Sequence, residues 1–226
     1  QALEIVEANP DKFRVVALAA GSSNLQLLAE QAKRFSVPVV GTTGDRETFT
    51  RMFTGKNKVE VIDGAKSSSE IAAIACDIVL NGISGSIGLG PTLAALSVGN
   101  KVALANKESL VAGGDLVMAF GRDQIIPVDS EHSALYQCFL SGKASEVKQV
   151  ILTASGGPFR DHNDLSDISV ADALNHPTWS MGPVVTINSA TLMNKGLEII
   201  EAHYLFDLPY SKISAVIHPQ SIVHSM

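Results

Sequence analysis

Two carboxylates close an apolar run in the segment P-V-D-S-E-H, residues 127–132, just before a helix is expected. Side chains two positions apart on an extended segment point the same way, so Asp129 and Glu131 can face one cation. Ser130 then lies at the start of the helix. An Asp-Ser pair before a helix is also an ordinary N-cap, and this alternative stays open from spacing alone.

A second polar group follows in S-A-T-L-M-N-K-G-L-E, where Asn194, Lys195 and Glu198 share one side of a predicted helix. We expect a strand over 184–187 and a helix from Ser189. The free N–H groups near that start, with the charge of Lys195, favour a phosphate. The alternative is a solvated polar face. The opposite side is expected to be buried through its apolar residues: Met193, Leu197, Ile200 and Tyr204.

A third group, Asn106, Lys107 and Glu108, stands where a predicted apolar strand becomes a helix, at the expected mouth of a crevice. A surface Lys-Glu pair opening a helix is the alternative. The glycine-rich run over 81–91 lacks the G-x-G-x-x-G spacing of a dinucleotide loop. Its glycines are expected to let the backbone approach a flat ligand closely.

Apolar runs alternate with helical patterns along the chain. After a helix over 1–8, the order is strand 13–21, helix 25–35, strand 37–41, helix 46–53, strand 58–62, helix 69–76, strand 77–81, helix 91–98, strand 101–105, helix 108–120 and strand 124–128. The alternation predicts an α/β fold with a doubly wound parallel sheet, Rossmann-like, and strand 13–21 buried on both faces. A helix over 133–140, a strand over 147–154 and a last strand from Ile213 predict a following α+β domain. Ligands bind at the carboxyl ends of such strands.

The first predicted strand ends in G-S-S-N, residues 21–24, where a nucleotide domain contacts the ribose. A carboxylate here binds the 2′-hydroxyl of NAD, and none is present. Ser22, Ser23 and Asn24 can donate to a 2′-phosphate instead, so NADP is favoured over NAD. An ordinary helix cap is the alternative.

The polar stretch from Ser155 to Pro183 has little periodicity and contains H-P-T-W-S-M-G. Long loops of this kind are usually functional or disordered. Glycines at its two ends flank Trp179, the only tryptophan, and predict a mobile lid that closes an aromatic ring over a substrate. A core tryptophan under a long loop is the alternative.

Composition excludes some classes of binding partner. The net charge of −6 and the absence of a long Lys/Arg cluster argue against nucleic acid, and no apolar run is long enough to cross a membrane. Cys76 and Cys138 are expected to be buried thiols in a reducing compartment. Small molecules are therefore the expected partners.

Six motifs together resemble the 1-deoxy-D-xylulose 5-phosphate reductoisomerase family: A-N-K-E-S-L, P-V-D-S-E-H, L-T-A-S-G-G-P-F, H-P-T-W-S-M-G, N-S-A-T-L-M-N-K-G-L-E and I-H-P-Q-S-I-V-H-S-M. The resemblance implies an NADPH- and divalent-metal-dependent enzyme, an oxidoreductase and isomerase. It would convert 1-deoxy-D-xylulose 5-phosphate, a phosphorylated ketose, to 2-C-methyl-D-erythritol 4-phosphate in non-mevalonate isoprenoid biosynthesis.

The resemblance also implies roles for matching residues. Asp129, Glu131 and Glu198 would hold the metal, for which carboxylates suit Mg²⁺ or Mn²⁺. The catalytic residues would be Lys107, Glu131 and His176. Substrate contacts would come from Lys107, Ser130, Glu131, Ser155, His176, Trp179, Met181, Ser189, Asn194, Lys195, Glu198, Ser221 and His224. NADPH contacts would come from Gly21, Ser22, Ser23, Asn24, Asn106, Glu108 and Gly182.

The family's G-x-T-G-S-I-G fingerprint would precede Gln1 and a helical C-terminal domain would follow Met226, so we expect the chain to be a fragment. An NADPH-binding domain over 1–128 and a catalytic metal- and substrate-binding domain over 129–226, with a lid at about 155–183, are expected. A homodimer in a bacterial cytoplasm or a plastid stroma is expected too. The rival functions are another NADP-dependent dehydrogenase and a metal-dependent sugar-phosphate aldolase or isomerase without nicotinamide.

Overall fold

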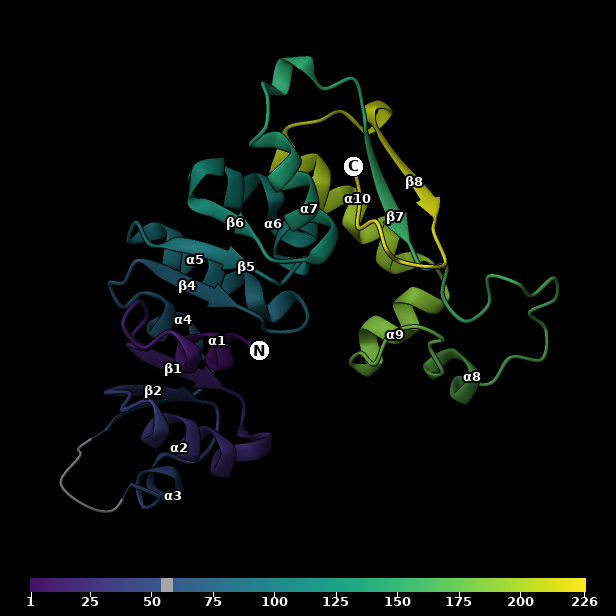
Figure 1. The fold of residues 1–226 in the computed structure, drawn as a ribbon. Helices are drawn as coiled ribbons and strands as arrows, with labels where there is room; N and C mark the ends of the chain where they lie inside the picture. The colour runs from purple at the N-terminus through teal and green to yellow at the C-terminus, as the bar shows by residue number, and fades with distance from the viewer. Residues whose placement is uncertain (54–58) are drawn as a thin grey trace. The chain divides into compact units, whose positions relative to one another are not determined.

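The computed structural model describes residues 1–53 and 59–226, which divide into two compact units. The first unit comprises residues 1–79 with 90–102, and the second comprises 80–89 with 103–226. Figure 1 shows the helices and strands of both. The expected boundary after residue 128 separates an NADPH-binding domain from a catalytic domain, and this functional division stays a prediction.

The first unit contains a parallel sheet with the order β1-β2-β3. Its strands are β1 (Ala17–Ala20), β2 (Val39–Thr42) and β3 (Glu60–Asp63). Lys58, where the third strand was expected to begin, lies outside the described residues. The helices before and between the strands, and after β3, are α1 (Ala2–Ala8), α2 (Leu25–Arg34), α3 (Arg46–Thr50) and α4 (Ser67–Ala72).

Helices cover both faces of this sheet. Successive residues of β2 point to opposite faces, and each of two neighbouring residues meets a helix. Val40 belongs to a buried cluster with residues of α2 and α3, among them Leu28 and Phe49. Gly41, the next residue, faces α4 so closely that a Cβ there would lie 2.6 Å from Cγ1 of Ile71. The alternation therefore confirms the doubly wound α/β arrangement.

The expectation that the first strand is buried on both faces is wrong. β1 is four residues long, and Ala19 and Ala20 are exposed. Among the described residues, β1 pairs with β2 in this sheet. An apolar run alone does not show how much of a strand is covered.

A second sheet has the order β4-β5-β6, with strands Ile78–Asn81, Lys101–Leu104 and Ile125–Pro127. The short connections after these strands lead into α5 (Leu89–Ser97), α6 (Glu108–Met118) and α7 (Ser130–Phe139). Helix α7 begins three residues earlier than expected. The residues just after β5 and β6 therefore stand at the starts of helices.

The second unit also contains the parallel pair β7 (Val150–Ala154) and β8 (Ile213–Ile217). Helix α10 (Met193–Phe206) and helix α7 pack on this pair, and Leu135, Leu152 and Ala202 lie in their shared core. On the other side of β7, Ile151 exchanges two backbone hydrogen bonds with Met226. These contacts fix α7 and α10 against one strand.

The strand expected over 184–187 is wrong: these residues lie in helix α9 (Pro183–Ala190). Pro183 occupies the first helical turn, where its missing N–H costs nothing, and Gly182 is the N-cap. The stretch before it contains one short helix, α8 (Val170–Leu174), closed at its start by a reciprocal cap between Ser169 and Asp172. The lid expected over 155–183 stays a prediction.

Candidate active site

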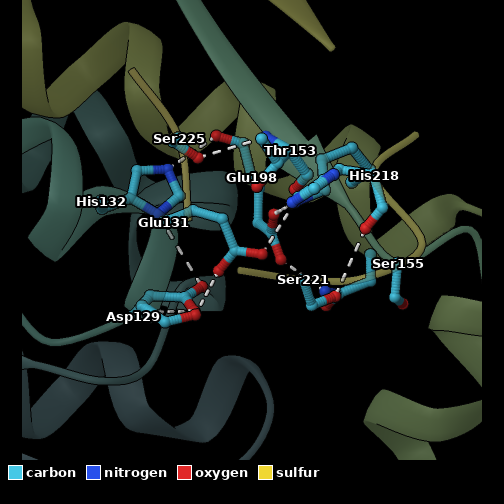
Figure 2. Close-up of polar contacts among 12 residues, drawn as sticks. Asp129, Glu131, His132, Thr153, Ser155, Glu198, His218, Ser221 and Ser225 are labelled. Atoms are coloured by element: carbon cyan, nitrogen blue, oxygen red, sulfur yellow. Dashed lines mark hydrogen bonds and ion pairs between the residues drawn. The ribbon is translucent and has the colours of Figure 1, made fainter. Parts of the chain in front are cut away.

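Three carboxylates converge in the second unit. Asp129, Glu131 and Glu198 each offer an oxygen within 4.8 Å of the oxygens of the other two. Figure 2 shows their side chains directed toward one another. The arrangement brings together residues separated by as many as 69 positions in the sequence, Asp129 and Glu198.

Asp129 and Glu131 were expected to reach this cluster from an extended segment. That expectation is wrong, because α7 begins at Ser130. Asp129 is the N-cap and accepts a hydrogen bond from the Ser130 N–H at 3.0 Å. Glu131 lies in the first helical turn and accepts from Ser130 Oγ at 2.5 Å. The N-cap alternative is therefore correct for Asp129, and the same residue also belongs to the cluster.

Lys107, which follows β5, inserts its ammonium among these carboxylates. Its Nζ lies 2.6 Å from Asp129 Oδ2 and 3.0 Å from Glu198 Oε1, and it donates to Asn194 Oδ1 at 3.1 Å. Burial alone lowers the pKa of Lys107, but Glu198 and Asp129 outweigh burial and raise it. Burial likewise opposes ionisation of Asp129, yet Lys107 holds its pKa below the usual value. Both groups are charged at neutral pH.

Lys195, on α10, makes the second set of ion pairs. Its ammonium contacts Glu131 at 2.9 Å, contacts Glu198 and donates to the Thr153 carbonyl. Burial opposes ionisation of Glu131, but Lys195 outweighs it and lowers the pKa of that carboxyl. Burial raises the pKa of Glu198 although both lysines oppose the rise. The two lysines thus carry the positive charge of the cluster.

The buried side of α10 is not the side expected. Lys195, Glu198 and Glu201 are buried, whereas Met193 is 56% exposed. The solvated-face alternative for Asn194, Lys195 and Glu198 is therefore wrong as well. Burial of Lys195 and Glu198 is tolerated because each one has partners of opposite charge.

Two buried residues beside the cluster were not expected. His132 and Glu201 are both fully buried, and Glu201 follows Glu198 by three positions on α10. Burial lowers the pKa of His132 and raises the pKa of Glu201 well above its usual value. The two acidic residues of E-I-I-E, three positions apart on the expected helix, and the histidine of P-V-D-S-E-H were the available signals.

A cavity of about 330 Å³ opens beside the cluster. Most of the expected substrate residues line it: Lys107, Ser130, Glu131, Ser155, Trp179, Met181, Ser189, Asn194, Lys195, Glu198, Ser221 and His224. Trp179 is 45% exposed and its ring meets that of His224 edge to face. The core alternative for Trp179 is therefore wrong.

His176 does not line this cavity but contacts one of its walls. Its Nδ1 accepts hydrogen bonds from the Thr178 and Trp179 N–H groups, at 3.1 and 3.0 Å. The proton of the neutral ring therefore resides on Nε2, which donates to Ser155 Oγ at 3.0 Å. Burial, followed by the charge of Arg160, lowers the pKa of His176. Ser155 and His176 thus form a coupled polar pair.

Ser189 was expected at the start of a helix. It lies instead in the last turn of α9. Helix α10 begins four residues later, after Leu192 in a left-handed conformation. The argument that free N–H groups near Ser189 attract an anion is therefore wrong. Its hydroxyl remains on the cavity wall.

Asn106 and Glu108, expected to contact the cofactor, bind the glycine-rich loop that follows β4. The Asn106 side chain is 1% exposed and donates to the carbonyls of Ile83 and Gly85. Glu108 accepts from the Gly85 N–H at 3.3 Å. These contacts hold the loop backbone, and contact with a cofactor stays a prediction.

The remaining expected cofactor residues are exposed. Gly21 precedes a 3-10 turn at Ser22–Asn24, and Asn24 caps α2 by accepting from the Leu27 N–H at 3.0 Å. The cap alternative is therefore correct for Asn24, while Ser22 and Ser23 remain exposed. Gly182 is likewise exposed, and a Cβ there would meet nothing within 4 Å.

The expectation of buried thiols is wrong for Cys138, which is exposed on α7, while Cys76 is half-buried; both are free. In the described ranges 1–53 and 59–226, none of the helices combines the length and apolar character needed to traverse a bilayer.

The parallel strands with their helices, and the cavity lined by clustered carboxylates and lysines, define a class: an α/β protein with a polar pocket of a size and lining suited to a small molecule. Comparisons with known proteins narrow this class. The model of 1-deoxy-D-xylulose 5-phosphate reductoisomerase matches residues 1–114, and the model of that enzyme's C-terminal domain matches residues 125–206. The chain belongs to the 1-deoxy-D-xylulose 5-phosphate reductoisomerase family.

Curated relatives carry the same name. The 1-deoxy-D-xylulose 5-phosphate reductoisomerase of Streptomyces coelicolor is 52% identical over 236 residues, which cover all of this chain and 56% of that protein. The relative from Beutenbergia cavernae is 55% identical over 233 residues, again covering the whole chain and 59% of the relative. The chain therefore spans a little over half the length of these relatives.

Solved structures agree in fold. A complex of DOX-P reductoisomerase with NADPH, fosmidomycin and magnesium superposes with a TM-score of 0.89 at 40% identity, covering 99% of this chain and 59% of that one. The Zymomonas mobilis enzyme in complex with NADPH gives a TM-score of 0.90 at 39% identity, with the same two coverages of 99% and 59%.

Proposed function

We propose that the protein containing this chain converts 1-deoxy-D-xylulose 5-phosphate to 2-C-methyl-D-erythritol 4-phosphate, with NADPH and a divalent cation. The observation that carries the proposal is the convergence of Lys107, Asp129, Glu131 and Glu198 on one cavity. Family membership and relatives solved with NADPH and magnesium support it.

The donor set fits Mg²⁺ or Mn²⁺. Asp129, Glu131 and Glu198 offer oxygen ligands, which hard cations prefer. The cation would polarise a substrate carbonyl or hydroxyl oxygen and stabilise negative charge that develops on it. Lys107 and Lys195 already contact these carboxylates, so the side chains nearest a bound cation carry both signs of charge.

Lys107 and Glu131 are proposed as the groups that move protons at the reacting hydroxyls. Both line the cavity, and each is held in its charged form by an ion pair, Lys107 with Asp129 and Glu131 with Lys195. Lys107 Nζ can donate a proton and a Glu131 oxygen can accept one. Ser130, adjacent to both carboxylates, would contact the middle of the substrate.

The phosphate end of the substrate is assigned to the polar wall made by Ser155, Ser189 and His176, with Asn194 and the charge of Lys195. His176 gives Ser155 a fixed partner at 3.0 Å, so the hydroxyl is oriented before substrate arrives. A phosphate anchored there would hold a small flexible substrate with its other end at the carboxylates. The remaining contacts are proposed from Trp179, Met181, Glu198, Ser221 and His224.

NADPH is proposed to contact two sets of residues. Gly21, Ser22, Ser23 and Asn24 would bind the ribose 2′-phosphate, which is supported by the exposure of both serines. Asn106, Glu108 and Gly182 would contact the rest of the cofactor. A homodimer and a bacterial cytoplasmic location are proposed from the family and from its bacterial relatives.

The test is NADPH oxidation by the full-length protein with 1-deoxy-D-xylulose 5-phosphate, with and without EDTA. Oxidation that EDTA abolishes and Mg²⁺ or Mn²⁺ restores is the expected result. Oxidation that EDTA leaves unchanged would favour another NADP-dependent dehydrogenase. Conversion of a sugar phosphate without NADPH would favour the aldolase or isomerase.

Glu131→Gln should abolish turnover while the protein stays folded, because the change removes one candidate ligand oxygen and one proton acceptor. Circular dichroism with the same NADPH assay separates the two effects. Wild-type rates in a folded Glu131→Gln protein would contradict the assignment.

A further inference from the structure

His132 connects the two helices that carry the three carboxylates. It lies in the first turn of α7, directly after Glu131, and its Nε2 is 2.9 Å from the backbone carbonyl of Glu198 on α10. A carbonyl oxygen only accepts hydrogen bonds, so Nε2 carries a proton and donates it. A side chain of α7 therefore donates a hydrogen bond to the backbone of α10 at Glu198, which is one of the three carboxylate residues.

The opposite nitrogen of His132 faces Glu201. Nδ1 lies 3.3 Å from Glu201 Oε2 and 3.9 Å from Asp129 Oδ2. Glu201 is fully buried, and neither of its oxygens has a hydrogen bond of standard geometry in the described part of the chain. His132 Nδ1 has none either, so its 3.3 Å approach to Oε2 is a close polar contact between two buried atoms that lack hydrogen bonds among the described residues. Helix α10 thus meets the imidazole at two positions about one turn apart, through a hydrogen bond at Glu198 and a close polar contact at Glu201.

Ring packing holds the imidazole in place. The His132 ring is parallel to the Phe206 ring, with centroids 6.4 Å apart, and Phe206 stacks on Phe139 at 4.8 Å. Because the imidazole is fully buried and flanked by these contacts, it has little freedom to turn. Displacement of His132 would move α7 relative to α10, and with it the distance between Asp129 and Glu198.

We propose that His132 and Glu201 are positioning residues that set the separation of Asp129 and Glu131 on α7 from Glu198 on α10. The inference rests on the proposed function in one respect, that these carboxylates hold a cation. Their oxygens must keep distances within a few tenths of an ångström for a hard cation to bind well. The buried pair is what maintains those distances across two helices.

The same atoms could also be ligands of a cation of their own, because Asp129, His132 and Glu201 offer atoms within 4.8 Å of one another. Two observations disfavour this reading. Asp129 Oδ2 is already paired with Lys107 at 2.6 Å. His132 and Glu201 do not line the cavity through which an ion would arrive.

The experiment uses the full-length protein and Mn²⁺, whose binding is measured by electron paramagnetic resonance of the free ion. His132→Phe keeps a ring for the Phe206 stack but removes both nitrogens. Glu201→Gln keeps the shape and supplies an amide donor to Nδ1, whereas Glu201→Leu supplies none. His203→Phe is the matched control, since His203 also lies on α10 but bonds to the Leu208 carbonyl.

Wild-type protein should bind one Mn²⁺ per chain. His132→Phe and Glu201→Leu should each weaken Mn²⁺ binding about 10- to 100-fold, as loss of groups that orient metal ligands does. Glu201→Gln should stay within about threefold of wild type, and His203→Phe should not change the affinity. In NADPH assays, His132→Phe should recover much of its kcat at high Mn²⁺ with the substrate KM little changed.

Three outcomes would overturn the proposal. The first is unchanged Mn²⁺ affinity in a folded His132→Phe or Glu201→Leu protein. The second is two Mn²⁺ ions in wild type with one lost in these variants, which would make the pair ligands. The third is absence of Mn²⁺ binding in wild type. If His132→Phe does not fold, the Glu201 variants decide, and failure of turnover with Mn²⁺ binding intact contradicts only the proposed function.

Discussion

Replacing Lys107 by methionine tests how strongly the carboxylate cluster depends on its internal cations. The Lys107 side chain is 11% exposed, and its ammonium lies 2.6 Å from Asp129 and 3.0 Å from Glu198. Methionine keeps most of the apolar stem and removes the charge. The cluster of three carboxylates and two ammoniums then has three negative charges and one positive charge.

Removing one partner of a buried ion pair typically costs about 3–5 kcal/mol, because the remaining charge stays buried without compensation. With a urea dependence of about 2 kcal/mol per molar, the unfolding midpoint should fall by about 1.5–2.5 M. The assay is urea unfolding of the full-length protein in EDTA, followed by circular dichroism. Asp207→Asn is the control, because it removes an exposed partner of Arg122 and should cost less than about 1 kcal/mol.

The loss of unfolding free energy in Lys107→Met, called the deficit below, should also depend on pH. The pKa of Lys107 is raised, so its contribution is complete below the ordinary value of 10.5. The pKa of Asp129 is lowered, so its contribution is complete above the ordinary value of 3.8 and is lost below it. In Lys107→Met the carboxylates take up protons at higher pH than in wild type, so the deficit should shrink as the pH falls toward 3.8.

Two results would refute this reasoning. One is a deficit no larger than that of Asp207→Asn, which would mean that the cluster is effectively solvated. The other is a deficit that stays constant from neutral to acidic pH, which would mean that methionine disturbs packing and not charge.

Three further predictions follow from the second unit. Gly157 has φ +68°, and a Cβ there would lie 2.5 Å from the Ser189 carbonyl oxygen, so Gly157→Ala should cost about 2–4 kcal/mol in thermal or urea unfolding. Unchanged stability would contradict the close approach. Asn106→Asp replaces the donor that holds the loop over 82–88 with an acceptor, so the NADPH KM should rise about tenfold, for a loss of roughly 1.4 kcal/mol. An unchanged KM would separate that loop from the cofactor. Asp129→Asn should flatten the loss of stability below pH 3.8, because the contribution of Asp129 is complete above that value and is lost as the pH falls toward its lowered pKa. An unchanged loss of stability in acid would assign that loss to other groups.

The grouping of the site residues could be predicted from the sequence because each group is local. Lys107 stands at a strand end, Asp129 and Glu131 at the next, and Lys195 and Glu198 three apart on one helix. Parallel strands bring their carboxyl ends to one edge of a sheet, so strand order alone predicts that the first two groups meet. The pairing of each lysine with particular carboxylates depends on side-chain positions and could not be predicted.

The strand expected over 184–187 was wrong for a physical reason. Val184 and Val185, followed by Thr186 and Ile187, suggest a strand, because branched residues favour strands. Pro183 and contacts with α8 and α10 place them in a helix instead. The preference of a short segment for strand is weak, and tertiary contacts of about the same free energy override it.

Helix α10 differs from an ordinary amphipathic helix because charged and acidic residues lie on its buried side. A helix normally buries its apolar side because burying charge costs free energy, yet Lys195, Glu198 and Glu201 are buried here. Hydrophobic residues at these positions would give a more stable helix. The charged residues instead build the cluster in which two lysines pair with three carboxylates, so these positions serve the candidate site at a cost in stability. His132 contacts the same helix, since its Nε2 donates to the Glu198 carbonyl while its ring packs on Phe206. The ion pairs of Lys195 with Glu131 and Glu198 thus partly offset the free energy lost in burying these charges.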